Sequence, residues 1–506
     1  MDGSPLGQAL QVLSAPQSLL LLGIGVLMGY VFGALPGLSM PMAVALALPF
    51  TYFMSLESAL VLLTAVYTGG LFGGVITSIL FNIPGESFQV AVMWDGNPLA
   101  RAGRAGEALT GAVVAYGVGG GVSLLFAVVC APLIARIATW FSPYELFGLI
   151  LFGLCSAAGF SHGSRLNSLI SLLLGLLLAT VGVDQVYGQP RFTFGVPLLR
   201  DGVEFLSVLI GLYAIGEVLQ AVGQKTPLMQ MGAASLGGAR AVRQALRAWP
   251  TLARGLLVGM GVGIHPGSGA ATVASFLAYS VEKQVGRHGK ELGSGRLEGV
   301  LAPQVAATAT EGAGLIPLLT LGIPASAAGA IMLAAFMLHG VQPGPALFTG
   351  ASAIPPVIFG AMFLALALTV LITVAGLRVF LGLLRLPEAF LYPLIVVFSY
   401  LGAYGTRNNL GDVWIATLFG LLGYLMARFS FPVPPLVLGL VLGPFAEHYL
   451  LTAWSLSMGD LTPFVTRPIS LLFLVLASAT LVVPLVGDLR RRGVATITPA
   501  STPGPE

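Results

Sequence analysis

Long apolar runs, separated by short polar segments, fill almost the whole chain of 506 residues. A helix needs roughly 20 apolar residues to cross a bilayer, so the chain has room for about a dozen crossings. The run from Leu19 to Tyr30 belongs to a retained span, because Met1 to Gln17 contain neither a basic residue nor a cleavage site. The pattern predicts an all-α, polytopic membrane protein.

Composition supports this prediction, because 56% of the residues are apolar and only 8% are charged, whereas soluble domains carry about 25% charged residues. The net charge of +3 includes no long run of lysine or arginine. This excludes a nucleic-acid-binding surface and leaves the lipid bilayer as the main partner. We expect no cofactor and no resident metal, although a transiently bound Na⁺ fits the pattern.

Glycine and proline interrupt the apolar runs at four places, which form two pairs. The motif GALPG at 33–37 is answered by GIHPG at 263–267, so that Pro266 and Gly267 follow Pro36 and Gly37 by 230 residues. The motif NIPG at 82–85 is answered by GIPA at 322–325, which lies 240 residues later. Non-helical backbone at membrane depth is tolerated only where protein covers it or a cavity borders it. We therefore expect two similar halves with helix-breaking hairpins at the membrane midplane.

Basic residues in short loops favour the cytoplasmic side, and corresponding loops of the two halves carry opposite patterns. Segment 51–56 has no basic residue, whereas its counterpart holds Lys283, Arg287, Lys290 and Arg296. The second break of the first half is followed by Arg101 and Arg104, whereas segment 340–350 is uncharged. This reversal predicts that the two repeats have inverted topology.

The predicted organisation is a first transmembrane repeat at 18–222, a cytoplasmic linker at 223–250, a second repeat at 251–449, an outer loop and last span at 450–492, and a disordered tail at 493–506. In the linker, Arg240, Arg243 and Arg247 recur at helical spacing. They predict a short basic helix on the inner membrane surface. A linker helix with no chemical role explains the same pattern.

The breaks are also where a binding site is expected. A broken helix whose N-terminus points at mid-membrane offers N–H groups and a positive dipole end to a carboxylate, while the carbonyl groups of its partner suit Na⁺. The candidate substrate- or ion-binding residues at the breaks are Ser39, Asn82, Pro84, Gly85, Ser87, Ser268, Thr308, Thr310, Glu311, Pro324 and Ser326, and Glu86, Gln89 and Thr272 complete the polar clusters. Each serine or threonine has a structural alternative, which is a hydrogen bond to a carbonyl one turn back in its helix.

Glu311 is the one charged residue between Val300 and Leu338. An ionisable group at membrane depth is costly unless it binds a ligand, forms a pair or stays protonated. Glu311 is therefore the candidate for coupling to a cation or a proton. Packing as a protonated acid is the alternative.

Several motifs resemble those of the large permease subunit of the tripartite tricarboxylate transporters: GALPGLSMPMAVALALP at 33–49, NIPG at 82–85, DGNPLARAGRAGEAL at 95–109, LIPLLTLGIP at 315–324, HGVQPGPALF at 339–348 and VLGLVLGPFAE at 437–447. The resemblance implies a cation-coupled secondary transporter that imports a carboxylate across a bacterial inner membrane. It also implies two partners, which are a small membrane subunit and a periplasmic solute-binding protein. After NIPG this sequence departs from the family pattern of small residues, because it has Glu86, Ser87, Phe88 and Gln89.

Two other classes of protein compete with a transporter. A passive anion channel has the same static pattern, and solute counterflow separates the two. An intramembrane enzyme is disfavoured because no His-Glu-x-x-His motif is present, and Gly267-Ser268-Gly269 is better explained as a helix break. The sequence leaves open which carboxylate is carried and whether Na⁺ or H⁺ drives its uptake.

Overall fold

The computed structural model describes residues 4–35, 38–159, 164–183, 188–200, 202–222, 235–265, 269–349, 352–383 and 388–495. The elements of the first part are α1 (Pro5–Ser14), α2 (Pro16–Ala34), α3 (Met40–Thr51), α4 (Leu56–Phe81), α5 (Gln89–Leu99), η1 (Ala100–Arg104), α6 (Ala105–Ala138), α7 (Pro143–Gly159), α8 (Arg165–Ala179), β1 (Gly182–Val183), β2 (Pro190–Arg191), η2 (Pro197–Leu199), α9 (Phe205–Leu209), η3 (Ile210–Ile215) and α10 (Gly216–Val222). Those of the second part are α11 (Gly238–Arg247), α12 (Trp249–Gly263), α13 (Ala270–Val285), η4 (Gly289–Glu291), α14 (Glu298–Leu321), α15 (Ala327–Leu338), α16 (Ala346–Thr349), α17 (Ile354–Leu383), α18 (Glu388–Arg407), α19 (Leu410–Arg428), α20 (Val433–Leu456), α21 (Thr462–Thr466) and α22 (Pro468–Ala495).

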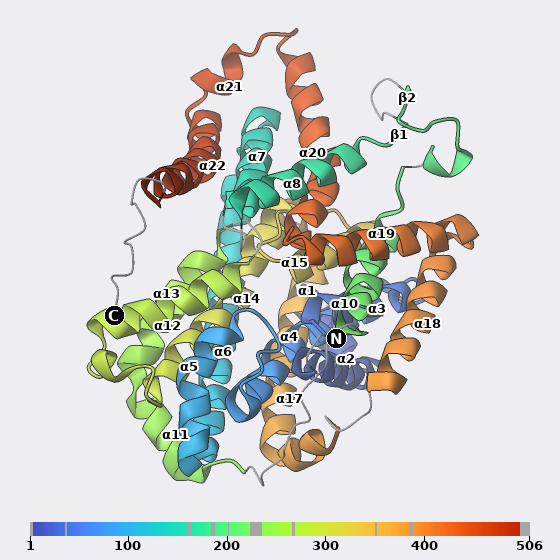
Figure 1. Ribbon diagram of the computed structural model, residues 1–506. Coiled ribbons are helices and arrows are strands. Elements are labelled where there is room, and N and C mark those ends of the chain that lie inside the picture. Colours follow the sequence, from blue (N-terminus) through green and yellow to red (C-terminus); the bar gives the residue numbers. More distant parts are fainter. Residues whose placement is uncertain are drawn as a thin grey trace, which may run out of the picture.

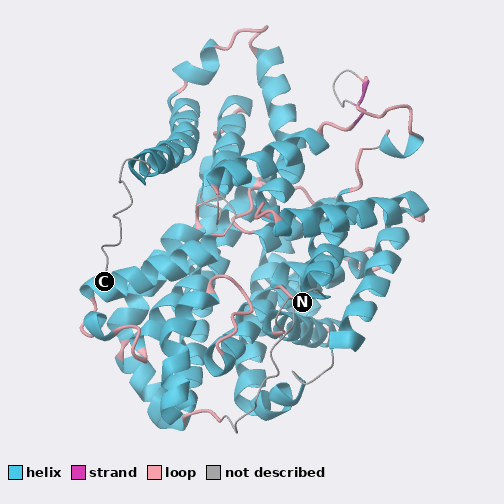
Figure 2. Ribbon diagram, in the orientation of Figure 1, coloured by secondary structure: helices cyan, strands magenta, loops and turns pink. Residues whose placement is uncertain are grey.

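Helices make up nearly all of the described structure, and β1 and β2 form one short antiparallel pair (Figure 2). Within the described ranges, 7 helices are long and apolar enough to cross a membrane, and several shorter apolar helices accompany them. Leu125, Val129 and Leu133 on α6 are exposed, as is expected of a helix face that meets lipid. The prediction of an all-α, polytopic membrane protein is confirmed.

Each of the four predicted breaks separates two helices. In the first half, the breaks lie between α2 and α3 and between α4 and α5. In the second half, they lie between α12 and α13 and between α14 and α15. The residues that directly follow α4 and α14, Asn82 and Gly322, are left-handed, with φ of 61° and 68°. Because asparagine and glycine enter this region more readily than other residues, they end both helices at the same point of the repeat.

The first helix of each half packs on the long helix before the second break through small residues. A methyl group added to Gly25, Gly29 or Gly33 of α2 would lie 2.0–2.8 Å from a backbone carbonyl oxygen of α4. The same holds for Gly255, Gly259 and Gly263 of α12, at 2.3–2.9 Å from carbonyl oxygens of α14. The glycines recur after 230 residues, and the contacted residues recur after 240: Leu62, Val66 and Gly70 against Ala302, Ala306 and Thr310. The close packing thus repeats at the offsets of the sequence motifs, while the inverted orientation of the halves stays a prediction.

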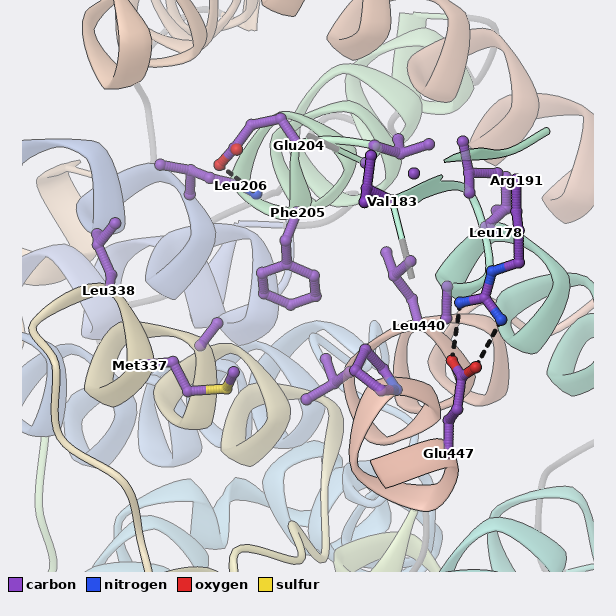
Figure 3. Close-up of a pocket in the computed structure, with 18 of the residues that line it drawn as sticks. Leu178, Val183, Arg191, Glu204, Phe205, Leu206, Met337, Leu338, Leu440 and Glu447 are labelled. Atoms are coloured by element: carbon purple, nitrogen blue, oxygen red, sulfur yellow. Dashed lines mark hydrogen bonds and ion pairs between the residues drawn. The ribbon is translucent and has the colours of Figure 1, made fainter. Parts of the chain in front are cut away.

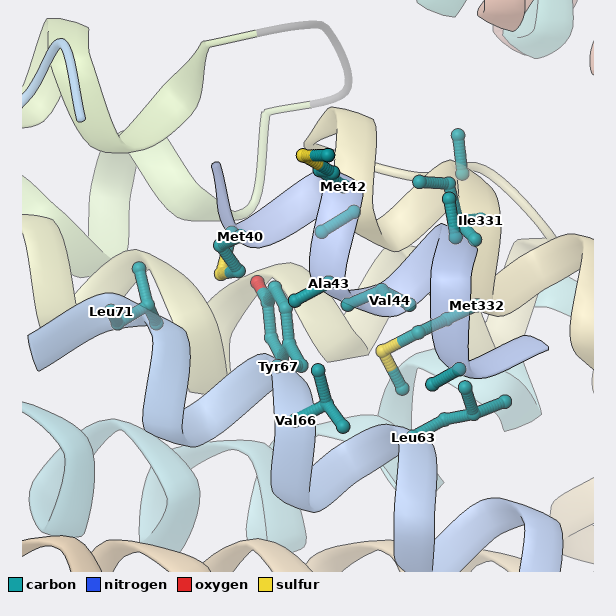
Figure 4. Close-up of a cluster of buried hydrophobic side chains, with 14 of the residues drawn as sticks. Met40, Met42, Ala43, Val44, Leu63, Val66, Tyr67, Leu71, Ile331 and Met332 are labelled. Carbon is teal, nitrogen blue, oxygen red and sulfur yellow. The ribbon is translucent and has the colours of Figure 1, made fainter. Parts of the chain in front are cut away.

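The two halves interlock. Helix α3 of the first half packs on α15 of the second, and α5 packs on α13. Likewise α6 packs on α14, while α17 packs on α4. Figure 4 shows where side chains of α3, α4 and α15 meet, with the Tyr67 hydroxyl directed toward Met40. The centre of the molecule is therefore built by both halves together.

The remaining helices surround this centre. Helices α7, α8, α20 and α22 pack together at one end of the molecule, at the top of Figure 1. Arg467, which directly precedes α22, ties that helix to α7, because its guanidinium bonds Glu145 and lies over the Tyr144 ring. A helix is present at Gly238–Arg247 in the predicted linker, and it packs on α6 through buried Ala241 and Ala245.

Candidate functional site

A cavity of about 370 Å³ lies where both halves meet. The first residues of α3, α5, α13 and α15, the helices that follow the four breaks, all border it, at Ser39–Pro41, Glu86–Phe88, Gly269–Thr272 and Ser326–Gly329. The first N–H groups of a helix have no partner inside the helix and form its positive end. At the start of α5 the first N–H groups, those of Gln89 and Val90, donate to the carbonyl groups of Glu86 and Ser87. The starts of α3, α13 and α15 border the cavity at a position that favours an anion or a bound carboxylate.

On the first-half side, a carboxylate of the protein already accepts a hydrogen bond from one of these donors. The backbone N–H of Met40, at the start of α3, donates to Oε1 of Glu86 at 2.7 Å. The neighbouring Ser39 hydroxyl donates to the Glu217 carboxylate, at 2.8 Å from each oxygen, and accepts the N–H of Met42. Gln89 fixes the loop, because its Oε1 accepts the N–H groups of Gly85 and Glu86. This side of the cavity thus presents two acidic side chains, each held by hydrogen bonds.

The second-half side differs at the position of Glu86. Ser326 lies 240 positions after Glu86, at the same place after the break, and its hydroxyl accepts the N–H of Gly329 in its own helix. It therefore places no carboxylate at the start of α13, where Ala270 and Thr272 line the cavity. The position that Glu86 fills in the first half therefore carries no carboxylate in the second.

A π-helix forms another wall of the cavity. The turn η3 (Ile210–Ile215) presents Tyr213, and Glu217 follows in α10. The sequence pattern did not indicate either residue, nor Tyr67 and Gln220, which also line the cavity. Glu217 carried a usable signal, because it is the one charged residue in the apolar span 205–222 and satisfies the rule that singled out Glu311. The π-turn itself has no signature in the sequence.

Four of the expected site residues line this cavity, namely Ser39, Ser87, Thr310 and Ser326. Asn82, Pro84, Gly85 and Pro324 instead shape the loops of the breaks and are absent from the lining. Gly85 is needed for a close approach, since a methyl group there would lie 2.1 Å from the carbonyl oxygen of Gly33. Pro36, Gly37, Pro266, Gly267 and Ser268 lie outside the described residues.

Thr308 shows the structural alternative in its simplest form. Its hydroxyl donates to the carbonyl of Gln304 at 2.9 Å, one turn back in α14, and accepts from the Gln304 side chain. Its side chain faces Gly119 and Gly120 of α6, away from the cavity lining. Thr310 also bonds a carbonyl of its own helix, that of Ala307, but it does line the cavity.

Glu311 is buried behind the cavity wall, with 2% of its surface exposed. Among the described residues its Oε1 has no partner within hydrogen-bond distance, and the Thr68 hydroxyl is the polar side-chain group beside its carboxyl group. Tyr67 lies near Glu311 and also lines the cavity, so it links the two. The geometry is compatible with both interpretations of Glu311, as a proton carrier and as a protonated acid in the core.

A second cavity, of about 560 Å³, contains none of the expected site residues. In it Arg191 forms a two-point ion pair with Glu447, with N–O distances of 2.5 and 3.1 Å (Figure 3). Burial raises the pKa of the Glu204 carboxyl at its rim, while the nearby Arg407 guanidinium opposes the shift. Arg191 is thus paired with Glu447, and Glu204 is paired with Arg407.

Comparisons with known proteins agree on one family. A sequence model of the tripartite tricarboxylate transporter TctA family matches residues 19–438, which include all the residues that line the cavity at the breaks. An uncharacterized 52.8 kDa protein in the TAR-I ttuC' 3' region of Agrobacterium vitis is 36% identical over 479 residues, or 93% of each chain. An uncharacterized protein in the TAR-II ttuC' 3' region of that organism is 38% identical over 231 residues, which are 46% of this chain and 95% of that protein. No solved structure matches this chain.

Proposed function

Because this chain belongs to the tripartite tricarboxylate transporter TctA family, we propose that it imports a tricarboxylate or a related small organic anion across the bacterial inner membrane. Membership implies the large subunit of a transport system, with a small membrane subunit and a binding protein as partners. We further propose that the binding protein delivers the solute from the periplasm and that Na⁺ or H⁺ drives its uptake.

One observation carries this proposal. The first-half carboxylate of Glu86 sits on the N-terminus of α3, at 2.7 Å from the N–H of Met40. The equivalent place in the second half, between the starts of α13 and α15, has Ser326 in place of the glutamate and opens on the cavity. A helix N-terminus that stabilises a carboxylate in one half makes the matching N-terminus a receptor for the carboxylate of a solute in the other.

A substitution that copies the first half into the second tests the site. In cells that express the whole transport system, Ser326→Glu would supply a tethered carboxylate at the start of α13 and exclude the solute. Uptake should fall by roughly a hundredfold, because the solute would lose charge-assisted hydrogen bonds worth ~1.5–3 kcal/mol each and would meet a like charge. Uptake of labelled citrate and of a panel of di- and monocarboxylates measures the loss.

Ser326→Gln is the matched control, because it adds similar bulk without the charge. It should retain clearly more uptake than Ser326→Glu at equal amounts of membrane-inserted protein. Equal uptake by Ser326→Glu and the parent would place the solute elsewhere.

Two further experiments address the mechanism of transport. Solute counterflow in proteoliposomes separates a transporter from a passive channel. Glu311→Gln tests coupling to a proton, since the loss of a proton carrier would remove the pH dependence of uptake.

A further inference from the structure

The geometry points to a second subsite in the same cavity: we infer that Glu86, Glu217, Ser39 and Tyr213 bind a monovalent cationic centre, supplied either by free Na⁺ or by an ammonium group on the solute. The subsite lies on the first-half side, opposite the N-termini of α13 and α15. Its biological meaning rests on the proposed function, whereas the existence of the subsite can be tested without any carboxylate.

The first argument is charge. Among the residues that line the cavity, Glu86 and Glu217 are acidic, and none is lysine, arginine or histidine. Neither carboxylate takes part in an ion pair within the described structure. Two carboxylates without a counter-charge at membrane depth are costly. A cation bound between them removes that cost.

The second argument is an oxygen atom that has no partner. The Tyr213 side chain is 4% exposed and borders the cavity, yet its hydroxyl has no hydrogen-bond partner in the described part of the chain. A buried polar group left unpaired costs free energy, so its position calls for a ligand. The phenol oxygen can accept an ammonium N–H or coordinate Na⁺, and it lies one helical turn before Glu217.

The donors already present leave acceptor capacity for that ligand. Within the described residues Glu86 uses only Oε1, for the N–H of Met40, and both oxygens of Glu217 share the single hydroxyl of Ser39. A carboxylate has about four lone-pair sites, so each of these carboxylates retains unused ones. Oxygen atoms from carboxylate and hydroxyl groups are the ligands that hard cations prefer.

The number of charges selects a monovalent cation. No group of three or more His, Cys, Asp or Glu residues suited to a metal ion occurs among the described residues. Divalent cations are usually held by more carboxylates or by fixed octahedral geometry. Two glutamates and two hydroxyl oxygens in an open cavity fit Na⁺ or an ammonium group better. Glu311 is excluded from this set because it does not line the cavity.

The test uses the purified full chain in detergent, with thermal unfolding and tryptophan fluorescence as readouts. NaCl is exchanged for choline chloride at constant ionic strength and constant pH, without any solute. Separately, L-glutamate is compared with glutarate, which is the same dicarboxylate without the ammonium group. A saturable effect of Na⁺ identifies a free cation, and an effect of L-glutamate beyond that of glutarate identifies an ammonium group.

Variants tie either response to the subsite. Glu217→Gln should weaken the apparent affinity for the active probe by about tenfold or more, since a hydrogen bond to a charged group is lost. Tyr213→Phe should also weaken it, and it should fold as the parent does, because its hydroxyl has no partner in the described part of the protein. Glu57→Gln, at an exposed carboxylate in the first turn of α4, is the matched control and should leave the affinity unchanged.

The inference is overturned if neither probe acts, if only pH has an effect, or if Glu217→Gln and Tyr213→Phe respond as the parent does. Such a result, combined with normal carboxylate uptake, would leave the proposed function intact. The opposite combination, a Na⁺ effect that depends on Glu217 without carboxylate uptake, would leave the subsite and remove the proposed function.

Discussion

At the scale of single residues, the carboxylates near the breaks divide by how well they are satisfied. Asp95, fully buried in α5, accepts the Tyr279 hydroxyl and the backbone N–H groups of Gly293, Gly295 and Arg296 at 2.8–2.9 Å. It ties α5 to the loop that precedes α14, so the DGNP motif has a structural role. Glu217, in contrast, accepts only the Ser39 hydroxyl within the described structure and borders the cavity.

Asp95→Asn should therefore destabilise the protein more than any change at the cavity. An amide cannot accept all of these donors, and its NH₂ group would face backbone N–H groups, so we expect a loss of about 3 kcal/mol or more in unfolding free energy. Chemical or thermal unfolding in detergent measures it. Asp460→Asn is the control, because Asp460 is exposed and bonds only Thr462 within the described structure, and its midpoint should hardly move. Equal effects of the two substitutions would contradict the structural role of Asp95.

The candidate site was predictable only in part, and particular residues show why. Ser39 and Ser326 were selected by their position after a break, and both border the cavity at a helix N-terminus, while their role in binding stays a prediction. Thr308 was selected by position alone, and its contacts depend on which face of α14 meets α6. Tertiary packing decides which face of α14 meets α6. Hydrophobic periodicity cannot reveal this face, because the helix is apolar on all sides.

At the scale of elements, glycine decides which helices touch. Gly29 and Gly259 each allow a backbone carbonyl of the long helix to approach where a side chain would stand. The spacing of four residues that produces this stripe is visible in the sequence at 25, 29 and 33 and again at 255, 259 and 263. The sequence does not show which helices of the two halves meet each other. The contacts of α5 with α13 and of α3 with α15 join residues far apart in the chain.

Valine substitutions on these helices test the packing with internal controls. Gly29→Val and Gly259→Val would place a methyl group 2.0 and 2.3 Å from the carbonyl oxygens of Val66 and Ala306. Each should lower stability by about 1–3 kcal/mol or prevent assembly, because overpacked helices must move apart. Gly23→Val and Gly261→Val lie on the same helices, where an added Cβ would meet no atom of another described element within 4 Å, and they should behave as the parent. Unfolding midpoints report the loss of stability, and size-exclusion profiles report failed assembly. If Gly29→Val matched Gly23→Val, and Gly259→Val matched Gly261→Val, the close packing would be refuted.

At the scale of the whole molecule, the cavity belongs to neither half alone. Its walls combine the starts of α3 and α5 with those of α13 and α15, so a carboxylate and a cation bound on opposite sides would each contact a different half. Their binding free energies would then be coupled, since each neutralises the charge that the other meets. The membrane orientation of the halves decides which side each break faces.

That orientation gives the last prediction. If the halves are inverted, the loop before α4 faces outside and the turn after α5 faces the cytoplasm, as the distribution of basic residues requires. In a background with Cys130 and Cys155 replaced, single cysteines at Ser55 and Gly103, both exposed, report the two sides. A membrane-impermeant maleimide added to intact cells should label Ser55→Cys only, and Gly103→Cys should react only after the membrane is opened.

Lys290→Cys, at an exposed position of the loop before α14, should follow Gly103→Cys, because the two loops share a side only when the repeats are inverted. Labelling of Ser55→Cys and Gly103→Cys from one side would exclude the inverted arrangement, and labelling of Lys290→Cys from outside would make the repeats parallel.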